Sequence, residues 1–353
     1  MPYPQLVATL LGPIISVTLA GAAEVPKPRT EAPVRHVLLS NGAHRYAMTI
    51  QVGQTQLEAG LDTGSTGLRI MPGVLAPGDV GPGRAARPYQ FDAGVRLNGR
   101  LSSGSLVIGD LSGRSAMEVV ETVTCVEDHP HCPAARIPAD EFRIQGDGLP
   151  NQGFRAILGV NMAEAEAPNP LVAMGVSRWI VELPRPGEQG PGRLVLNPSD
   201  AEVQGYVYLP LLPRYRDLHG GFHDAVAGCL RSADGRVQAC GAVMLDCGAP
   251  GISVHNAGFG QDALPNGSKA LLIFGDLAGR AQAMAAFTVG EHAHASHLEV
   301  VTDAARPETR IYAGLTPYYG FSVLYDPLHN RIGLKPRPLA PGGVQASLTP
   351  SPG

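Results

Sequence analysis

Apolar and polar residues alternate with a period of two along many short segments of the chain, which is the pattern of half-buried β-strands. In the first half this pattern predicts strands over residues 34–39, 46–52, 56–61, 68–72, 89–108, 117–123, 154–160, 178–183 and 192–196. In the second half it predicts strands over residues 207–212, 241–245, 310–314, 319–324 and 331–334. The helix that we predict is short, Pro170 to Met174, and ends at Gly175. The pattern therefore indicates an all-β fold.

The segment from Tyr89 to Ile108 is predicted to be a long β-hairpin, but its turn has two possible positions. Asn98-Gly99 is a dipeptide typical of hairpin turns. Asp92-Ala93-Gly94 is equally suited to form the tip. The pattern leaves both positions open.

The composition supports two folded units rich in turns. A chain of 353 residues is long for one hydrophobic core, so we expect two lobes. The 44 glycines and 32 prolines favour many turns and few long helices. A net charge of −4 gives no reason to expect binding to nucleic acid or to an anionic membrane surface.

Residues 1–23 have the features of a secretory signal peptide. Leu6 to Ala20 is a mostly apolar run, and small residues follow it at 20–23. The segment before the run has no Lys or Arg, so an uncleaved anchor or a misassigned start codon stays an alternative. The run is short for a spanning helix. We expect an exported protein, periplasmic or secreted, with no membrane span in the mature chain.

The five cysteines fit an oxidising compartment. Cys125 and Cys132 bracket a short loop, and Cys229 and Cys240 bracket a predicted hairpin, so each pair is predicted to form a local disulfide. Cys247 is left single. The alternative for the first pair is a zinc site that also uses two nearby histidines, His129 and His131.

Two strands of the predicted set run into similar turns, one in each half of the chain. Gln56 to Leu61 leads into the first turn, Asp62-Thr63-Gly64-Ser65, and Gly241 to Leu245 leads into the second turn, Asp246-Cys247-Gly248-Ala249. An apolar-apolar-Gly segment follows each turn later in its half, at 157–159 and 312–314. Two lobes related by an approximate two-fold axis would bring the two turns together.

These residues, in this order, resemble the pepsin-like family of aspartic peptidases over roughly residues 34–336. The first turn and its preceding strands are similar to that family's first active-site turn, and Phe91-Asp92-Ala93-Gly94-Val95 is similar to its flap, for which residues 89–101 are the candidate segment. Residues 193–200 resemble the strands that link its lobes, and residues 319–334 resemble its C-terminal strands. The resemblance implies a bacterial-type member with no long propeptide, because few residues separate Ala23 from Val34.

The resemblance implies a bilobal fold and the following organisation. Residues 1–23 are the signal, 24–33 a leader, 34–200 an N-terminal β lobe, 201–336 a C-terminal β lobe and 337–353 a disordered tail. It also implies that Asp62 and Asp246 are the catalytic pair, supported by Thr63, Gly64, Ser65, Cys247 and Gly248. The implied activity is hydrolysis of extended peptide or protein substrates by a monomer, usually at acid pH, without metal or cofactor.

The second turn departs from the family, which usually has Thr at the position of Cys247 and Thr or Ser at that of Ala249. A thiol is a weak donor and alanine has no side-chain donor. We therefore expect Asp246 to be the protonated partner. Phe91 also replaces a tyrosine, and Arg69 replaces an aromatic residue after the first turn. The alternative function is a catalytically impaired pepsin-like protein that serves as a binding or inhibitor module.

One further cluster was weighed as a metal site. His292 and His294 would lie on one face of a strand. A solvated surface segment is the preferred interpretation.

Overall fold

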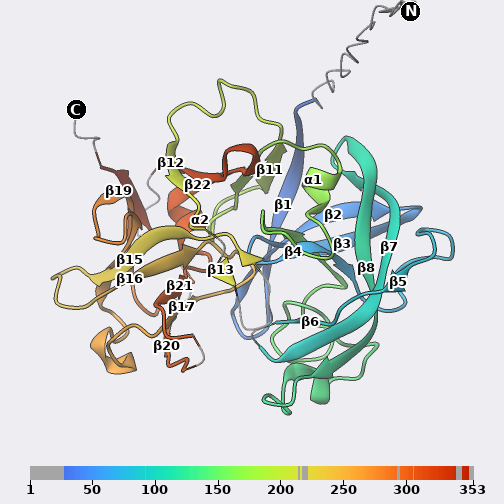
Figure 1. The fold of residues 1–353 in the computed structure, drawn as a ribbon, viewed down its shortest axis with the longest axis horizontal. Helices are drawn as coiled ribbons and strands as arrows, with labels where there is room; N and C mark the ends of the chain where they lie inside the picture. Colours follow the sequence, from blue (N-terminus) through green and yellow to red (C-terminus); the bar gives the residue numbers. More distant parts are fainter. Residues whose placement is uncertain are drawn as a thin grey trace, which may run out of the picture.

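The computed structural model describes residues 28–91, 93–213, 215–216, 222–291, 295–304, 306–338 and 344–349 (Figure 1). The fold is mostly β, which confirms the all-β class predicted from the alternating pattern. The helical segments among the described residues are α1 (Pro170–Ala173), α2 (Thr316–Gly320) and the 3-10 turns Pro133–Ala135, Gln261–Ala263 and Pro327–His329. Asn169 caps α1 by accepting hydrogen bonds from the first two free backbone amides.

The larger sheet has fourteen strands and includes strands from both halves of the chain. Its order is β12 (Val207–Pro210), β23 (Arg331–Pro336), β22 (Phe321–Asp326), β10 (Trp179–Glu182), β11 (Gly192–Leu196), β1 (Thr30–Leu38), β2 (His44–Val52), β3 (Thr55–Asp62), β9 (Ala156–Val160), β4 (Thr66–Ile70), β8 (Leu111–Cys125), β7 (Val95–Ile108) and β5 (Arg84–Ala85), with β6 (Tyr89–Gln90) also paired to β7. Strand β1 connects the strands from β12 to β11 with those from β2 to β5, because its first residues pair with β11 and its last residues pair with β2.

The second sheet has eight strands, all from the second half of the chain. Its order is β20 (Leu298–Val301), β17 (Ile252–His255), β21 (Arg310–Tyr312), β16 (Gln238–Met244), β15 (Val226–Ser232), β18 (Lys269–Gly275), β19 (Ala281–Thr288) and β24 (Gln345–Leu348), while β13 (Tyr215–Arg216) and β14 (Phe222–His223) form a separate pair. Figure 1 shows this sheet on one side of the molecule and the blue and green strands of the first half on the other.

The same three-strand arrangement occurs in both halves. Strand β9 lies between β3, to which it is parallel, and β4, to which it is antiparallel. Strand β21 lies in the same way between β16 and β17. Glycine is required beside each turn: a Cβ at Gly159 would lie 2.7 Å from the Gly67 carbonyl oxygen, and one at Gly314 would clash with the Gly251 carbonyl. The order of strand, aspartate turn and apolar-apolar-Gly segment repeats in the two halves of the sequence, and the structure pairs the corresponding strands in the same way in both halves.

Of the two turn positions left open for the long hairpin, the structure is consistent with the second, and one predicted strand start is wrong. Asn98-Gly99 is a bulge within β7 and not a turn, because β7 pairs with β8 on both sides of it. The β6–β7 connection spans residues 91–94, where the Phe91 amide donates to the Val95 carbonyl at 2.9 Å. Residues 316–320 form α2, so the strand predicted from Tyr319 begins only at Phe321.

The predicted disordered tail is also wrong for residues 345–348. They form β24, which pairs antiparallel with β19. The Pro- and Gly-rich sequence around residues 345–348 gave no sign of a strand. The strand forms because these residues pair with the edge of β19. The predicted lobe boundary at residue 200 does not separate the sheets, because β12, β22 and β23 join the larger one.

The predicted signal, residues 1–23, lies outside the described residues. Within the described ranges, no helix combines the length and the apolar character that crossing a membrane requires.

Candidate active site

The first turn connects β3 to β4, and its aspartate is the last residue of β3. The Asp62 side chain is only 5 % exposed. Its Oδ1 accepts a hydrogen bond from the Gly64 amide at 2.8 Å, and its Oδ2 accepts one from the Ser65 hydroxyl at 2.5 Å. Two donors from the same turn therefore hold this carboxylate in one orientation.

The second turn follows β16. The Oδ1 of Asp246 accepts a hydrogen bond from the Gly248 amide at 2.8 Å, which matches the bond between Gly64 and Asp62. Ala249 occupies the position that corresponds to Ser65. The two turns thus share their backbone geometry and differ in the hydroxyl that only the first turn supplies.

Each carboxylate lies directly over the glycine of the opposite turn. A Cβ added at Gly64 would overlap the carboxylate of Asp246 and lie 2.5 Å from its Oδ2. A Cβ added at Gly248 would lie 2.5 Å from Oδ1 of Asp62. Real Cβ atoms essentially never approach a heavy atom this closely. The structure therefore brings Asp62 and Asp246, hereafter the carboxylate pair, face to face across two glycines.

The residues after the two aspartates bind the opposite turns. Thr63 Oγ1 accepts a hydrogen bond from the Cys247 amide at 2.9 Å and donates to the Leu245 carbonyl at 3.0 Å. In the other direction, Cys247 Sγ lies 3.5 Å from the Leu61 carbonyl. Burial, and then the negative charge of Asp62, raise the pKa of the Cys247 thiol, so it remains a neutral S–H donor.

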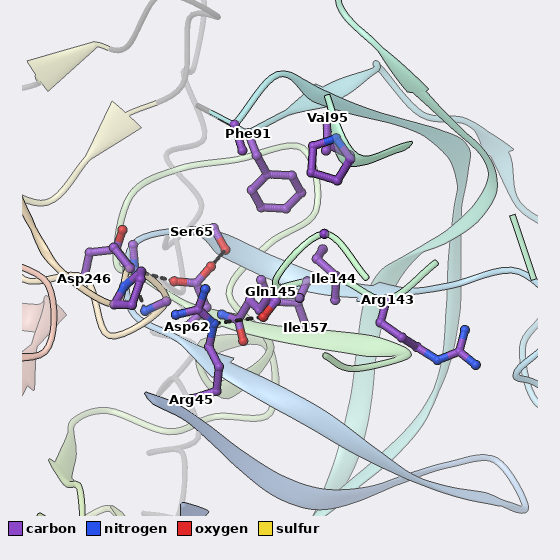
Figure 2. Close-up of a pocket in the computed structure, with 18 of the residues that line it drawn as sticks. Arg45, Asp62, Ser65, Phe91, Val95, Arg143, Ile144, Gln145, Ile157 and Asp246 are labelled. Carbon is purple, nitrogen blue, oxygen red and sulfur yellow. Dashed lines mark hydrogen bonds between the residues drawn. The ribbon is translucent and has the colours of Figure 1, made fainter. Parts of the chain in front are cut away.

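A cavity of about 340 Å³ opens above the carboxylate pair (Figure 2). Figure 2 shows Phe91 and Val95 on the opposite side of it from Arg45. Apolar side chains line much of the cavity, namely Phe91, Val95, Ile137, Phe142, Ile144 and Ile157. The cavity therefore combines an apolar wall with a charged floor, as binding sites for small ligands or side chains do.

The segment predicted as a flap, residues 89–101, covers this cavity through Phe91. The Phe91 ring packs edge-on against Tyr89 at 5.0 Å, and Arg69 lies over the other side of Tyr89, with its Cζ 3.4 Å from the ring centroid. Arg69 also pairs with the buried carboxylate of Glu118 at 3.0 Å. Arg69, at a position where the resemblance led us to expect an aromatic residue, thus contacts the base of this segment.

Sequence reasoning missed two polar residues of the cavity floor, Arg45 and Gln145. Arg45 is 7 % exposed, and its Nε donates to the Gln145 carbonyl at 2.8 Å. Burial lowers the pKa of the Arg45 guanidinium, and the charges of the carboxylate pair oppose that effect. The Gln145 side chain touches the second turn, because its Nε2 lies 2.9 Å from the position of a Cβ on Gly248. The positive φ of Gln145, 55°, was not visible in the sequence.

Both predicted disulfides are confirmed. Cys125 is bonded to Cys132, and Cys229 to Cys240. The first bridge closes a loop against the flap, since the Val126 amide donates to the Gly94 carbonyl at 2.9 Å. With its thiols joined to each other, this loop does not present the thiolate ligands that the alternative zinc site needs.

The remaining predicted residues lie at the carboxylate pair, in the β6–β7 segment or outside the described residues. Thr63, Gly64, Ser65, Cys247 and Gly248 all lie at the carboxylate pair, and Phe91 and Gly94 lie in the β6–β7 segment. Asp92, His292 and His294 lie outside the described residues. The catalytic role of each residue stays a prediction.

Comparison of the sequence with protein-family models gives no match, and comparison with curated proteins gives none.

Proposed function

We propose that this protein is an aspartic endopeptidase of the pepsin-like class, with Asp62 and Asp246 as its catalytic pair. The observation that carries the proposal is the packing of each carboxylate on the opposite glycine. Two turns from distant parts of the sequence meet there, at the floor of a cavity large enough for a side chain.

Two carboxyl groups at such close range favour sharing one proton, because two neighbouring negative charges repel. The ionised carboxylate removes a proton from a bound water, and the water oxygen attacks the carbonyl carbon of the peptide. The protonated partner donates a hydrogen bond to the carbonyl oxygen and stabilises the charge that develops on it. Proton transfer to the amide nitrogen then releases the amine product and a carboxylic acid.

The asymmetry of the two turns supports Asp246 as the protonated partner. Ser65 donates a hydrogen bond to Asp62 at 2.5 Å, and this bond favours the ionised form. Ala249, at the corresponding position of the second turn, has no hydroxyl to do the same. A crystal structure at atomic resolution tests the assignment: two equal C–O bonds in Asp246 and two unequal ones in Asp62 would contradict it.

The substrate that fits this site is a peptide in extended conformation. Its backbone would lie across the carboxylate pair, with one apolar side chain against the wall of Phe142 and Ile157. Phe91, at the tip of the flap, would cover the scissile bond and exclude water. The two disulfides support export to an oxidising compartment.

The test is cleavage of a peptide library from pH 3 to pH 7 by the purified protein and by three variants. Asp62→Asn and Asp246→Asn keep side-chain size and remove one carboxylate each. Asp234→Asn is the matched control, since Asp234 stabilises a hairpin turn through Ser232. We expect each active-site variant to lose at least ~10³-fold in kcat/KM and the control to retain full activity.

Cleavage that survives both Asp62→Asn and Asp246→Asn would refute the proposal. If the folded wild-type protein binds library peptides in a pull-down but cleaves none from pH 3 to pH 7, the alternative of an impaired binding or inhibitor protein replaces it. That alternative is supported by Cys247 and Ala249 in the second turn and by Phe91 in the flap segment.

A further inference from the structure

A chain of buried hydroxyl groups lies beneath the two turns. The Tyr318 hydroxyl lies 2.6 Å from Thr63 Oγ1, 2.5 Å from the Tyr325 hydroxyl and 3.2 Å from the Leu245 carbonyl. Tyr318 belongs to α2 and Tyr325 to β22. One tyrosine therefore contacts the first turn and the residue that immediately precedes Asp246.

We infer that Tyr318 is a positioning residue that braces the link between the two turns, which Cys247 supports only weakly from its side. This inference rests on the proposed function. The contact that Cys247 makes with Leu61 is an S–H···O contact of 3.5 Å, and thiols are weak donors. Thr63 makes the corresponding contact with Leu245 through an O–H donor at 3.0 Å. The hydroxyl of Tyr318 lies 2.6 Å from Thr63 Oγ1 and 3.2 Å from the same Leu245 carbonyl, so it is placed to support this link.

The hydrogen bonds of the chain are mutually consistent. Each hydroxyl has one proton to donate and can accept two bonds. Tyr325 can donate to Tyr318, Tyr318 to Thr63, and Thr63 to the Leu245 carbonyl, while Thr63 also accepts from the Cys247 amide. Chains of this kind polarise each successive bond, which strengthens the last one. The last bond is the one that fixes the backbone beside Asp246.

The surroundings of the two tyrosines hold their rings in place and keep their hydroxyl groups protonated. Tyr318 and Tyr325 are fully buried, and the Tyr325 ring stacks on Trp179 with a centroid distance of 5.6 Å. Burial raises the pKa of both phenols well above their usual value. Both hydroxyls therefore remain donors throughout the pH range in which a carboxylate pair works.

The experiment is a mutant cycle between Tyr318 and Cys247. Tyr318→Phe removes one hydroxyl and leaves the ring in place, and Cys247→Thr restores a hydroxyl to the second turn. Tyr319→Phe is the matched control, because Tyr319 is equally buried and its hydroxyl bonds Tyr46 and neither turn. Each variant is made in both backgrounds, and kcat, KM and Tm are measured.

We expect Tyr318→Phe to lower kcat about tenfold, the equivalent of one buried hydrogen bond, with KM nearly unchanged. In the Cys247→Thr background the loss should shrink to about threefold or less, because a Thr hydroxyl at position 247 can donate to the Leu61 carbonyl and so link the two turns in the other direction. Tyr319→Phe should leave kcat within about twofold in both backgrounds. Equal losses from Tyr318→Phe in the two backgrounds, or from Tyr318→Phe and Tyr319→Phe, would overturn the inference.

Melting temperatures separate this inference from the proposed function. If the wild-type protein cleaves nothing, the proposed function fails, but bracing still requires that Cys247→Thr reduce the Tm loss caused by Tyr318→Phe. Additive Tm changes would then overturn the inference as well. If Tyr318→Phe does not fold, Tyr325→Phe, which removes the previous hydroxyl of the chain, takes its place in the same cycle and is judged by the same criteria.

Discussion

Replacing Gly248 with alanine inserts one methyl group into the contact that defines the site. The new Cβ would lie 2.5 Å from Oδ1 of Asp62, 2.8 Å from its Cγ and 2.9 Å from Nε2 of Gln145. The φ angle at Gly248 is not in the left-handed region, so the backbone itself accepts alanine. The perturbation is therefore steric and directed at one carboxylate.

The size of the required displacement follows from the contact distances. An ordinary contact of a Cβ begins at 3.4 Å, so Oδ1 of Asp62 has to move by about 0.9 Å from its 2.5 Å position. That movement lengthens the hydrogen bond from the Gly64 amide and misaligns the carboxylate pair. A misplacement of about 1 Å costs roughly 10²-fold in rate, or about 2.7 kcal/mol of transition-state stabilisation. Overpacking costs about 1–3 kcal/mol of stability.

The assay compares kcat/KM for a cleaved library peptide among the wild type, Gly248→Ala, Gly64→Ala and Gly260→Ala. Gly64→Ala makes the reciprocal perturbation on Asp246. Gly260 is the matched control, since an added Cβ meets no atom within 4 Å and its φ is −86°. Thermal unfolding of each variant shows whether it is folded at the assay temperature.

We expect both active-site glycine variants to fold and to lose about 10²-fold or more in kcat/KM, while Gly260→Ala stays near the wild type. A folded Gly248→Ala protein that keeps its activity within about threefold would refute the reasoning, because the carboxylate of Asp62 could then not lie against the second turn. An equally large loss of kcat/KM in Gly260→Ala would also refute the reasoning, because the effect would then not depend on the contact with a carboxylate.

Three further predictions concern buried charges. Arg45→Met removes the positive charge in the cavity floor, which favours the ionised carboxylate pair, so both limbs of the pH–rate profile should move to higher pH; an unmoved profile would contradict this. Burial alone would raise the pKa of Asp303, but its hydrogen bonds to the neighbouring arginines, Arg310 first, lower it to about 2. Its ionised form therefore stabilises the fold above about pH 4, and the Tm deficit of Asp303→Asn should be full at pH 6 and vanish as the pH falls toward 2; a deficit independent of pH would count against the ion pair. Arg69→Met leaves the buried carboxylate of Glu118 without its cation and should cost about 3–5 kcal/mol in denaturant unfolding, most of which Arg69→Met combined with Glu118→Leu should recover; no recovery would point to lost packing instead.

The local features were predictable because they depend on residues a few positions apart. An apolar strand followed by Asp62-Thr63-Gly64-Ser65 predicts a carboxylate at a strand end, and the structure has it there with donors from the same turn. Cys229 and Cys240 flank an Asp-Gly turn, so their pairing follows from the hairpin register. In each case the partner lies within the same turn or hairpin.

Patterns that depend on neighbours elsewhere in the chain were left open or misread. Asn98-Gly99 has the composition of a turn, but the long pairing of β7 with β8 makes it a bulge. Residues 345–348 have the composition of a tail, but the open edge of β19 makes them a strand. The local preference in each case is weaker than the pairing that the sheet offers.

By itself the sequence determined the all-β class, the two aspartate turns and the two disulfides, because each is set by alternation or by short-range chemistry. Only the tertiary structure decided that the two turns meet through their glycines, that Arg45 lies in the cavity floor and that the Tyr318 hydroxyl lies against Thr63 and the Leu245 carbonyl. These residues come from different segments of the chain, and the pairing of β9 and β21 with the strands on either side of them holds the two turns in place. The physical reason is that a hydrogen bond between distant residues depends on strand pairing across the whole sheet, which no local pattern records.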